Sequence, residues 1–257
     1  MAKKFYIKQD KSFEYNQPVL VNGEEFNHIA NVLRKKVHDK ICVIDGSGTD
    51  YECEIEQINK KDLILKIVNM IDNNSETQCD VTVFQALVKG DKFELIIQKL
   101  TELGVKNFVP FESEFCQVKS NTTRLDRLDK ISIEALKQCG RSKKVEIGEI
   151  LSFDKMIEKL KEFEKVVFAY ENSTTSLTEK DLEDQNGKKL KKVAIVVGSE
   201  GGFSEKENEL ITKQANVKQI SMGNRILRAE TAAISLTSVV MFLLGEWERK
   251  WKFVFLH

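Results

Sequence analysis

The sequence offers no set of residues that would hold a metal ion or a disulfide framework. Its five cysteines are scattered and odd in number, no C-x-x-C pair occurs, and its three histidines match no metal-ligand spacing. We therefore expect reduced thiols and no bound metal. The amino terminus, MAKKFYIKQD, also lacks the apolar segment of a signal peptide, so we expect a cytoplasmic protein.

A membrane-spanning segment is missing as well. The longest apolar stretch, residues 229–244, carries Glu, Thr and Ser and is shorter than the ~20 residues that cross a bilayer. We interpret it as a buried helix and expect no contact with a membrane. Because this helix is apolar around most of its circumference, it requires burial on more than one side, which a core and a subunit interface would provide together.

An excess of either charge is also absent, because forty Lys and Arg balance forty Asp and Glu. The composition therefore does not indicate a strongly basic nucleic-acid-binding protein. Local basic clusters remain at 3–4, 34–36, 141–144 and 188–192. Any one cluster of this kind is more often a solvated surface than a binding site.

Two common phosphate-binding motifs do not occur. The absence of G-x-G-x-x-G removes support for a Rossmann dinucleotide site, and the absence of G-x-x-x-x-G-K-[ST] removes support for a P-loop. A nucleotide-dependent α/β enzyme of unrelated chemistry is disfavoured for the same reason.

What the chain does contain is enough apolar material, 41% of 257 residues, for one large domain or two smaller ones. Its first part predicts a helix at about 24–35 and then short strands at 40–45, 50–58 and 62–70. The residues Asp45-Gly46-Ser47-Gly48 form a turn signal between the first two strands. Mostly antiparallel strands with one helix indicate a small barrel or half-barrel.

The remainder of the chain alternates strand and helix after a polar, aperiodic stretch at 72–77 that indicates a linker. The predicted strands are 81–87, 108–111, 166–170, 193–197 and 217–221. The predicted helices are 93–103, 125–139, 153–163, one that begins after Ser204 in a capping box with Glu207, and 229–244. This alternation is typical of an α/β domain, a parallel sheet with helices on both faces.

Three segments that follow predicted strands bear the residues of chemical interest, because ligands of open α/β sheets lie at the carboxyl ends of the strands. They are AYE at 169–171, GSEGG at 198–202 and SMGNRILR at 221–228. Glycines let the main chain approach a ligand closely, although a tight strand-to-helix turn explains 198–202 equally well. Arg225 and Arg228 suit an anion or a nucleic acid, but they are also explicable as partners of glutamates.

Together, VVGSEGGFSEKE at 196–207 and SMGNRILRAETAA at 221–233 resemble the family of ribosomal RNA small subunit methyltransferase E. Similar motifs extend along most of the chain: KGD at 89–91, IQK at 97–99, TELG at 101–104, QCGR at 138–141, His28 with VLR at 32–34, and DGSG at 45–48. Two departures are Ser199, where the family usually has proline, and His38, where glycine is common.

The resemblance implies a fold and an activity. Members of this family are S-adenosylmethionine-dependent enzymes of the SPOUT class that methylate N3 of a uridine in 16S rRNA. Their fold is α/β, a parallel sheet with a C-terminal trefoil knot, preceded by a small PUA-like β-barrel. For this chain the resemblance implies a PUA-like RNA-binding domain at 1–72, a linker at 73–79 and a SPOUT methyltransferase domain at 80–257. It also implies a homodimer whose partner is 16S rRNA or the small ribosomal subunit.

The expected site residues follow from the same motifs. We expect Arg225 and Arg228 to bind phosphate or to stabilise a developing anion. Glu200 or Glu230 is expected to accept a proton or to fix an arginine, and the sequence does not choose between them. The expected cofactor-binding residues are Ala169, Tyr170, Glu171, Gly198, Ser199, Glu200, Gly201, Gly202, Met222, Gly223, Ile226 and Leu227. The expected RNA-binding residues are Arg34, Lys35, Lys36, Lys89 and Arg141.

One alternative from another class remains open at this point, a non-catalytic RNA- or ribosome-binding protein that keeps the SPOUT fold. The presence of both C-terminal motifs speaks against it, and a cofactor-binding titration separates the two hypotheses.

Overall fold

The computed structural model describes residues 3–9, 11–120 and 123–248 and contains two compact units. Unit 1 comprises residues 1–76 and 129–145, and unit 2 comprises residues 77–128 and 146–257. The expected linker spans the point where the chain first passes from unit 1 to unit 2, whereas segment 129–145, which we expected in the second domain, groups with the first unit. Residues 1–2, 10, 121–122 and 249–257 of the expected domains lie outside the described residues.

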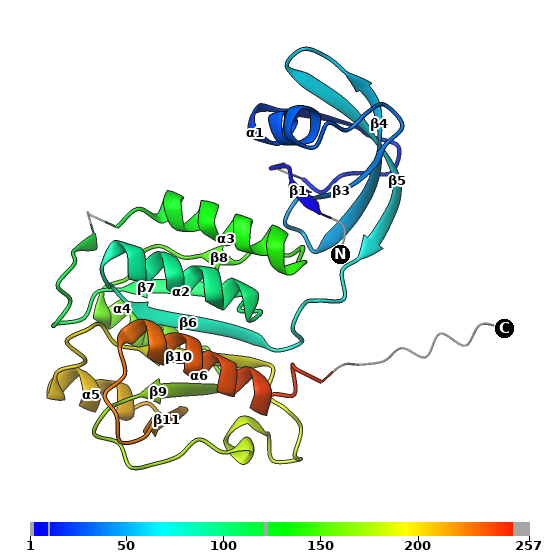
Figure 1. The fold of residues 1–257 in the computed structure, drawn as a ribbon. Helices are drawn as coiled ribbons and strands as arrows, with labels where there is room; N and C mark the ends of the chain where they lie inside the picture. The colour runs from blue at the N-terminus through cyan, green and yellow to red at the C-terminus, as the bar shows by residue number, and fades with distance from the viewer. Residues whose placement is uncertain (1–2, 10, 121–122, 249–257) are drawn as a thin grey trace. The chain divides into compact units, whose positions relative to one another are not determined.

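Unit 1 is built on a five-stranded sheet that curls around its core (Figure 1). The strand order is β1 (Lys4–Tyr6), β3 (Lys40–Ile44), β4 (Thr49–Ile58), β5 (Asp62–Asp72) and β2 (Pro18–Asn22). All neighbours are antiparallel except β1 and β3. The three predicted strands are confirmed. The sequence pattern did not predict β1, which is very short, or β2, which lies at the edge of the sheet and alternates buried and exposed residues.

The helix of unit 1 ends earlier than the sequence predicted. It consists of α1 (Gly23–Phe26) continued by a π-helix (Asn27–Val32), whereas we expected helix to residue 35. The chain leaves the helix because Arg34 adopts a φ of 53°, in the left-handed region. The apolar face predicted for this helix is confirmed for its first part, because Phe26 and Ile29 are buried in the core of the unit.

A buried lysine fixes residues 140–142 to this sheet. Lys4 Nζ donates to both carboxylate oxygens of Asp50 at 2.7 and 2.8 Å, to the Gly140 carbonyl at 2.7 Å and to Ser142 Oγ at 2.8 Å. Its side chain is only 8% exposed. The amide of Asn73 donates to the same three residues. The buried charge is thus both paired and fully hydrogen-bonded, which is the condition for burying a charge without a large cost.

Unit 2 contains a six-stranded sheet in which all neighbours are parallel. The strand order is β11 (Val217–Ile220), β9 (Lys165–Ala169), β10 (Lys192–Val197), β6 (Asp80–Ala86), β7 (Asn107–Phe111) and β8 (Glu146–Ile147). β6 and β10 are nearly continuous buried runs, as expected of strands covered on both faces. The predicted parallel sheet is confirmed, and only the two-residue β8 was not predicted.

Helices cover both faces of this sheet (Figure 1). α4 (Phe153–Leu160) and α5 (Glu205–Thr212) pack on one face around a cluster that contains Phe84, Phe111 and Phe168. α2 (Gly90–Glu102) and α6 (Ala229–Leu243) contact each other over the other face. α3 (Leu125–Cys139) has the predicted bounds and passes from unit 2 into unit 1. A short 3₁₀ helix, Glu179–Leu182, precedes β10.

The capping box predicted at the start of α5 is confirmed. The Glu207 amide donates to Ser204 Oγ at 3.3 Å, and the Ser204 amide donates to a carboxylate oxygen of Glu207 at 3.0 Å. Within the described parts of the chain, no helix has the length and apolar character needed to cross a bilayer. The knot implied by the resemblance concerns how the chain is threaded, which strand order does not define, and it stays a prediction.

Candidate active site

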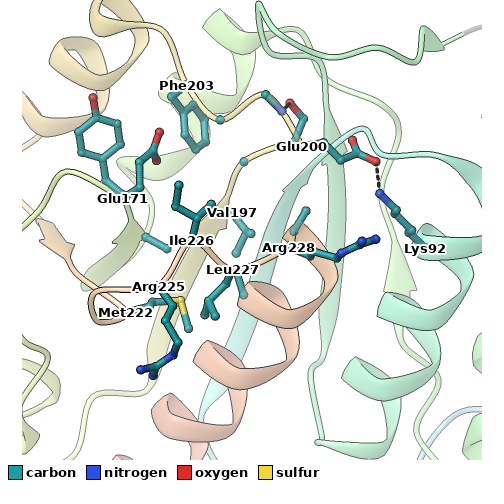
Figure 2. Close-up of a pocket in the computed structure, with 18 of the residues that line it drawn as sticks. Lys92, Glu171, Val197, Glu200, Phe203, Met222, Arg225, Ile226, Leu227 and Arg228 are labelled. Carbon is teal, nitrogen blue, oxygen red and sulfur yellow. Dashed lines mark hydrogen bonds and ion pairs between the residues drawn. The ribbon is translucent and has the colours of Figure 1, made fainter.

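A pocket lies at the carboxyl ends of three adjacent strands of unit 2 (Figure 2). β11, β9 and β10 are neighbours and run parallel, so the segments that follow them emerge at the same edge of the sheet. The cavity has a volume of about 450 Å³, which lies in the range of roughly 300–1,000 Å³ that is usual for small-molecule and cofactor sites. The three segments singled out in the sequence therefore line one cavity.

Most of the expected site residues line this pocket. Glu200, Arg225 and Arg228 do so. All the other expected cofactor-binding residues line it too: Ala169, Tyr170, Glu171, Gly198, Ser199, Gly201, Gly202, Met222, Gly223, Ile226 and Leu227. Glu230 does not line the cavity. It lies in the first turn of α6, and its Oε2 atom is buried without a hydrogen bond from any described residue.

Each of the three glycines in 198–202 lies so close to a neighbouring residue that a side chain would not fit. A Cβ at Gly198 would lie 2.9 Å from the ring of Phe203, and a Cβ at Gly201 would lie 2.7 Å from the Cβ atom of Phe115. Gly202 has a φ of +71°, and a Cβ there would lie 3.0 Å from a carboxylate oxygen of Glu171. A side chain at any of the three positions would push the loop away from its neighbours, so the bare backbone sets the shape of this pocket wall.

Ser199 supplies a local constraint of its own at the position where the family usually has proline. The Gly202 amide donates to the Ser199 carbonyl at 3.1 Å and closes a tight turn. The Gly201 amide donates to Ser199 Oγ at 3.3 Å inside that turn. A serine hydroxyl that binds a backbone amide two residues on is a common way to stabilise a turn. The side chain is buried, which keeps water from competing for the bond.

Glu200 is paired with a lysine from the start of α2. Lys92 Nζ lies 2.8 Å from Glu200 Oε1, and the side chains are 22% and 19% exposed. Burial alone would raise the pKa of Glu200, but the hydrogen bond from Lys92, the charge of Lys92 and backbone hydrogen bonds at Glu200 and Lys89 outweigh it and hold the pKa below its usual range. The hydrogen bond to Glu200 in turn raises the pKa of Lys92. Both groups are therefore charged at neutral pH.

The two arginines point toward different ends of the pocket. Arg228 is the residue before the first turn of α6, and its side chain extends toward the side where Lys92 and Glu200 meet (Figure 2). Arg225 points away from that pair (Figure 2). Among the described residues no ion pair joins Glu200 to either arginine, so its partner is the lysine and not one of the arginines that the sequence suggested.

Sequence reasoning missed five residues of the pocket wall. They are Lys92, Val197, Phe203, Ala229 and Ala232. Four of them adjoin or lie close to segments that we had singled out. Lys92 comes from elsewhere, because it follows the carboxyl end of β6, which is the neighbour of β10. The same strand-end rule that identified the other segments would have found it once the strand order was known.

The expected RNA-binding residues fall into two groups. Arg34, Lys36 and Lys89 are exposed, and Lys35 is half-buried. Arg141 is different, because its side chain is only 3% exposed and its guanidinium lies 2.8 Å from a carboxylate oxygen of Glu76 within unit 1. It binds a protein carboxylate in this structure, and its contact with RNA stays a prediction.

Comparison with protein families identifies the class. A model of the RNA methyltransferase domain matches residues 75–241, and a model of the RNA methyltransferase PUA domain matches residues 21–68. The parallel sheet, the pocket at its carboxyl edge and the curled N-terminal sheet are thus those of an RNA methyltransferase of the SPOUT class with a PUA-like domain.

Individual relatives identify the family. The chain is 31% identical over 247 residues to ribosomal RNA small subunit methyltransferase E of Bacillus subtilis (strain 168), across 93% of this chain and 96% of that protein. It is 30% identical over 224 residues to the protein of that name from Rickettsia conorii (strain ATCC VR-613 / Malish 7), across 87% and 89% of the two chains. The chain belongs to the ribosomal RNA small subunit methyltransferase E family.

Two solved structures resemble the whole chain. One is ribosomal RNA small subunit methyltransferase E from Neisseria gonorrhoeae bound to S-adenosylmethionine, with a TM-score of 0.81 and 26% identity across 95% of this chain and 98% of that one. The other is a Legionella pneumophila protein in complex with the same cofactor, with a TM-score of 0.79 and 26% identity across 94% and 98%.

Proposed function

We propose that the protein transfers a methyl group from S-adenosylmethionine to N3 of a uridine in 16S rRNA. As a member of its family, the chain is an rRNA methyltransferase that depends on this cofactor. The observation that carries the proposal is the single pocket formed by segments 198–202 and 221–228, with a cluster of charged side chains at one end.

The pocket wall fits the cofactor in its chemistry. One side is the main chain of the glycine loop, and the other carries Met222, Ile226 and Leu227. Ile226 is 92% exposed, and a flat apolar ring such as adenine would cover it. Glu171 beside Gly202 and Glu200 beside Lys92 provide negative charge near a cationic ligand. When bound, S-adenosylmethionine supplies a methyl group carried by a sulfonium.

The protein must make uridine N3 nucleophilic. The nitrogen carries a proton, and loss of that proton places negative charge on N3 and on the two carbonyl oxygens beside it. Alignment of the reacting groups is worth ~7–11 kcal/mol, and a positioned base contributes ~10²–10⁴-fold in rate. Arg225 and Arg228 bind the phosphate or face the developing anion, and Glu200 or Glu230 accepts the proton.

The target uridine must be unpaired, because N3 is buried inside a Watson–Crick pair. In our proposal, Arg34, Lys35 and Lys36 of the domain at 1–72 bind the RNA around the target uridine. Lys89 extends the basic surface of the methyltransferase domain at 80–257, since it is exposed and immediately precedes α2, which carries Lys92 into the pocket wall. Contacts of this kind position the RNA without reading its sequence.

A homodimer is the proposed assembly, and the end of α6 with the residues that follow it is the proposed interface. Val239 is 46% exposed, Phe242 62% and Trp247 55%, and the last two rings meet edge to face with their centroids 5.9 Å apart. Exposed apolar surfaces of this kind mark sites of protein association. We assign the protein to the cytoplasm, where the ribosomal subunits that it modifies are assembled.

Two measurements test the function. Calorimetric titration of the protein with S-adenosylmethionine is expected to give a saturable 1:1 binding curve. Mass mapping of 16S rRNA from cells that lack the protein is expected to show one uridine without its N3 methyl group, and purified protein with the cofactor is expected to restore it. An unaltered 3-methyluridine in those cells would overturn the assigned substrate. Binding of the cofactor with no methylation of any rRNA would favour the non-catalytic alternative.

A further inference from the structure

One cation of the pocket has no role in the mechanism so far. Lys92 lines the cavity from the first turn of α2, and among the residues that the structure describes its side chain bonds to Glu200 Oε1 alone, at 2.8 Å. An ammonium has three N–H donors. Glu200 uses one of them, so two remain for groups that enter the pocket.

We propose that Lys92 is a further catalytic residue of the methyl transfer. Its ammonium donates a hydrogen bond to one of the two carbonyl oxygens beside N3 of the bound uridine as negative charge develops there. Glu200 holds the ammonium in place. The inference rests on the proposed function, because it names a residue of the same site.

The surroundings of Lys92 suit this role. The Lys92–Glu200 pair is partly shielded from water, at 22% and 19% exposure, so an interaction with a substrate charge is stronger there than at the surface. Glu200 raises the pKa of Lys92 by its hydrogen bond, and burial, which lowers it, is outweighed. The ammonium therefore stays charged through the neutral and mildly alkaline range.

The charges around Lys92 and Glu200 allow the cations of the site to stabilise the uracil oxygens when N3 loses its proton. Arg228 and Glu230 both act on Lys92 from the start of α6, the former lowering and the latter raising its pKa. Proton loss from N3 moves one negative charge onto the uracil ring. Because Glu200 stays ionised as the partner of Lys92, the proton passes to Glu230, the other carboxylate assigned to this step, which becomes neutral. The sum of charges in the site is unchanged by this step, so Lys92 and Arg228, whose charges act together with that of Glu230, are left to face the uracil oxygens. Preorganised cations at the point where charge develops are the commonest large source of enzymatic rate enhancement.

Glu200 is a positioning residue in this scheme. Its other oxygen, Oε2, is buried and receives no hydrogen bond of normal geometry from the described residues. Both side chains line the cavity and are similarly exposed, at 22% and 19%. Only the lysine can donate a hydrogen bond to an oxygen that gains negative charge, because an ionised carboxylate only accepts hydrogen bonds.

The test compares methylation of small ribosomal subunits from cells lacking the protein, with S-adenosylmethionine bearing a tritiated methyl group. Lys92→Met is expected to lower kcat by about 10²–10³-fold, the usual loss when one such donor is removed, while the Kd for the cofactor changes by less than about threefold. Lys92→Arg keeps the charge and the bond to Glu200 and is expected to lose less than about tenfold. Lys99→Met is the matched control, because Lys99 is ion-paired to Glu102 further along α2 and outside the pocket.

Glu200→Gln and the double variant K92M/E200Q separate direct contact from neutralisation of Glu200. If Lys92 touches the substrate, Glu200→Gln lowers kcat less than Lys92→Met does. The kcat of the double variant then equals that of Lys92→Met. The proposal is overturned if the double variant recovers activity relative to Lys92→Met, if Glu200→Gln is the more damaging single change, or if Lys92→Met turns over within about threefold of the wild-type protein. A wild-type protein that does not methylate the subunits at all refutes the proposed function instead.

Discussion

The side-chain amide of Gln85 donates to the carbonyl oxygen of Gly198 at 3.0 Å and joins the end of β6 to the first glycine of the loop. Gln85 is fully buried in the centre of the sheet, opposite Val197 of β10. Its nitrogen also donates to the Ala86 carbonyl at 3.0 Å, whereas its oxygen is buried and accepts no bond from the described residues. A buried polar group with an unpaired atom destabilises the fold. We therefore attribute the presence of Gln85 to its hydrogen bond with the glycine loop.

Replacement of Gln85 by methionine is expected to weaken cofactor binding more than folding. The change leaves the Gly198 carbonyl without a donor, which lowers the free energy of unfolding by about 1–3 kcal/mol. It also removes the unpaired side-chain oxygen of Gln85, which offsets part of that loss. We expect the Kd for S-adenosylmethionine, measured by calorimetry, to rise at least about fivefold, with a fall in Tm of only a few degrees. Thr101→Val is the control, because Thr101 is equally buried and binds the Ile97 carbonyl within α2. Equal effects of the two changes on the Kd would contradict this role of Gln85.

Replacement of Gly202 by valine is expected to abolish cofactor binding while the fold persists. The added side chain meets the Glu171 carboxylate and must adopt a φ of +71°, where L-residues are strained. Gly187→Val is a closely matched control, because Gly187 has a φ of +72° but nothing within 4 Å of its Cβ position. The control carries the same backbone strain without the clash. Both proteins should melt cooperatively, and only Gly202→Val should give no heat on titration with S-adenosylmethionine. Unchanged titration heats for Gly202→Val would remove the glycine loop from the cofactor site.

Replacement of Lys4 by methionine is expected to destabilise unit 1 severely. Removal of one member of a largely buried ion pair costs about 3–5 kcal/mol, because the other charge is left without compensation. Here the remaining charge is Asp50, and the double variant Lys4→Met with Asp50→Leu should recover part of the loss. Urea unfolding followed by circular dichroism measures both. Lys161→Met is the control, because its pair with Glu158 is 53% and 70% exposed and is worth no more than ~1 kcal/mol. A loss for Lys4→Met as small as that for the control would show that the network is not what fixes residues 140–142.

Three thiols are expected to resist alkylation in the native protein. Burial raises the pKa of Cys53 and of Cys79 to about 12, and that of Cys42 to about 11. The thiolate is the reactive form, and at pH 8, which is below all three values, almost none of it is present. Iodoacetamide at pH 8 should therefore leave these residues unmodified in peptide mass spectra and should label all five cysteines in guanidinium chloride. Rapid labelling of Cys53 in the folded protein would show that unit 1 opens readily.

The elements predicted correctly are those whose signals are local. The capping box of Ser204 and Glu207 lies within four consecutive positions, and the strands of unit 2 are short runs of apolar residues, so neighbouring side chains define both. The helix predicted to residue 35 failed for the opposite reason. Its apolar spacing continued, but the backbone turned at Arg34 with a positive φ, and nothing in the spacing reports a backbone angle.

The pocket shows where the sequence sufficed and where it did not. The strand-end rule and the resemblance together singled out segments 169–171, 198–202 and 221–228, and the parallel order β11, β9, β10 brings them together. The partner of Glu200 was not predicted, because Lys92 lies 108 residues away in the chain and reaches the pocket only through the pairing of β6 with β10. The burial of Arg141 was not predicted for a similar reason, since a basic run looks exposed until the fold places Glu76 beside it.

By itself the sequence determined the α/β alternation, the family and the chemistry of the two C-terminal motifs, because apolar periodicity and glycine-rich turns are written in consecutive residues. The tertiary structure decided which charges meet. Lys4 reaches Gly140 across 136 residues, and Lys92 reaches Glu200 across 108, through strand pairings that no local pattern encodes. An ion pair depends on a distance of a few ångströms between groups far apart in the chain, and only the folded sheet fixes that distance.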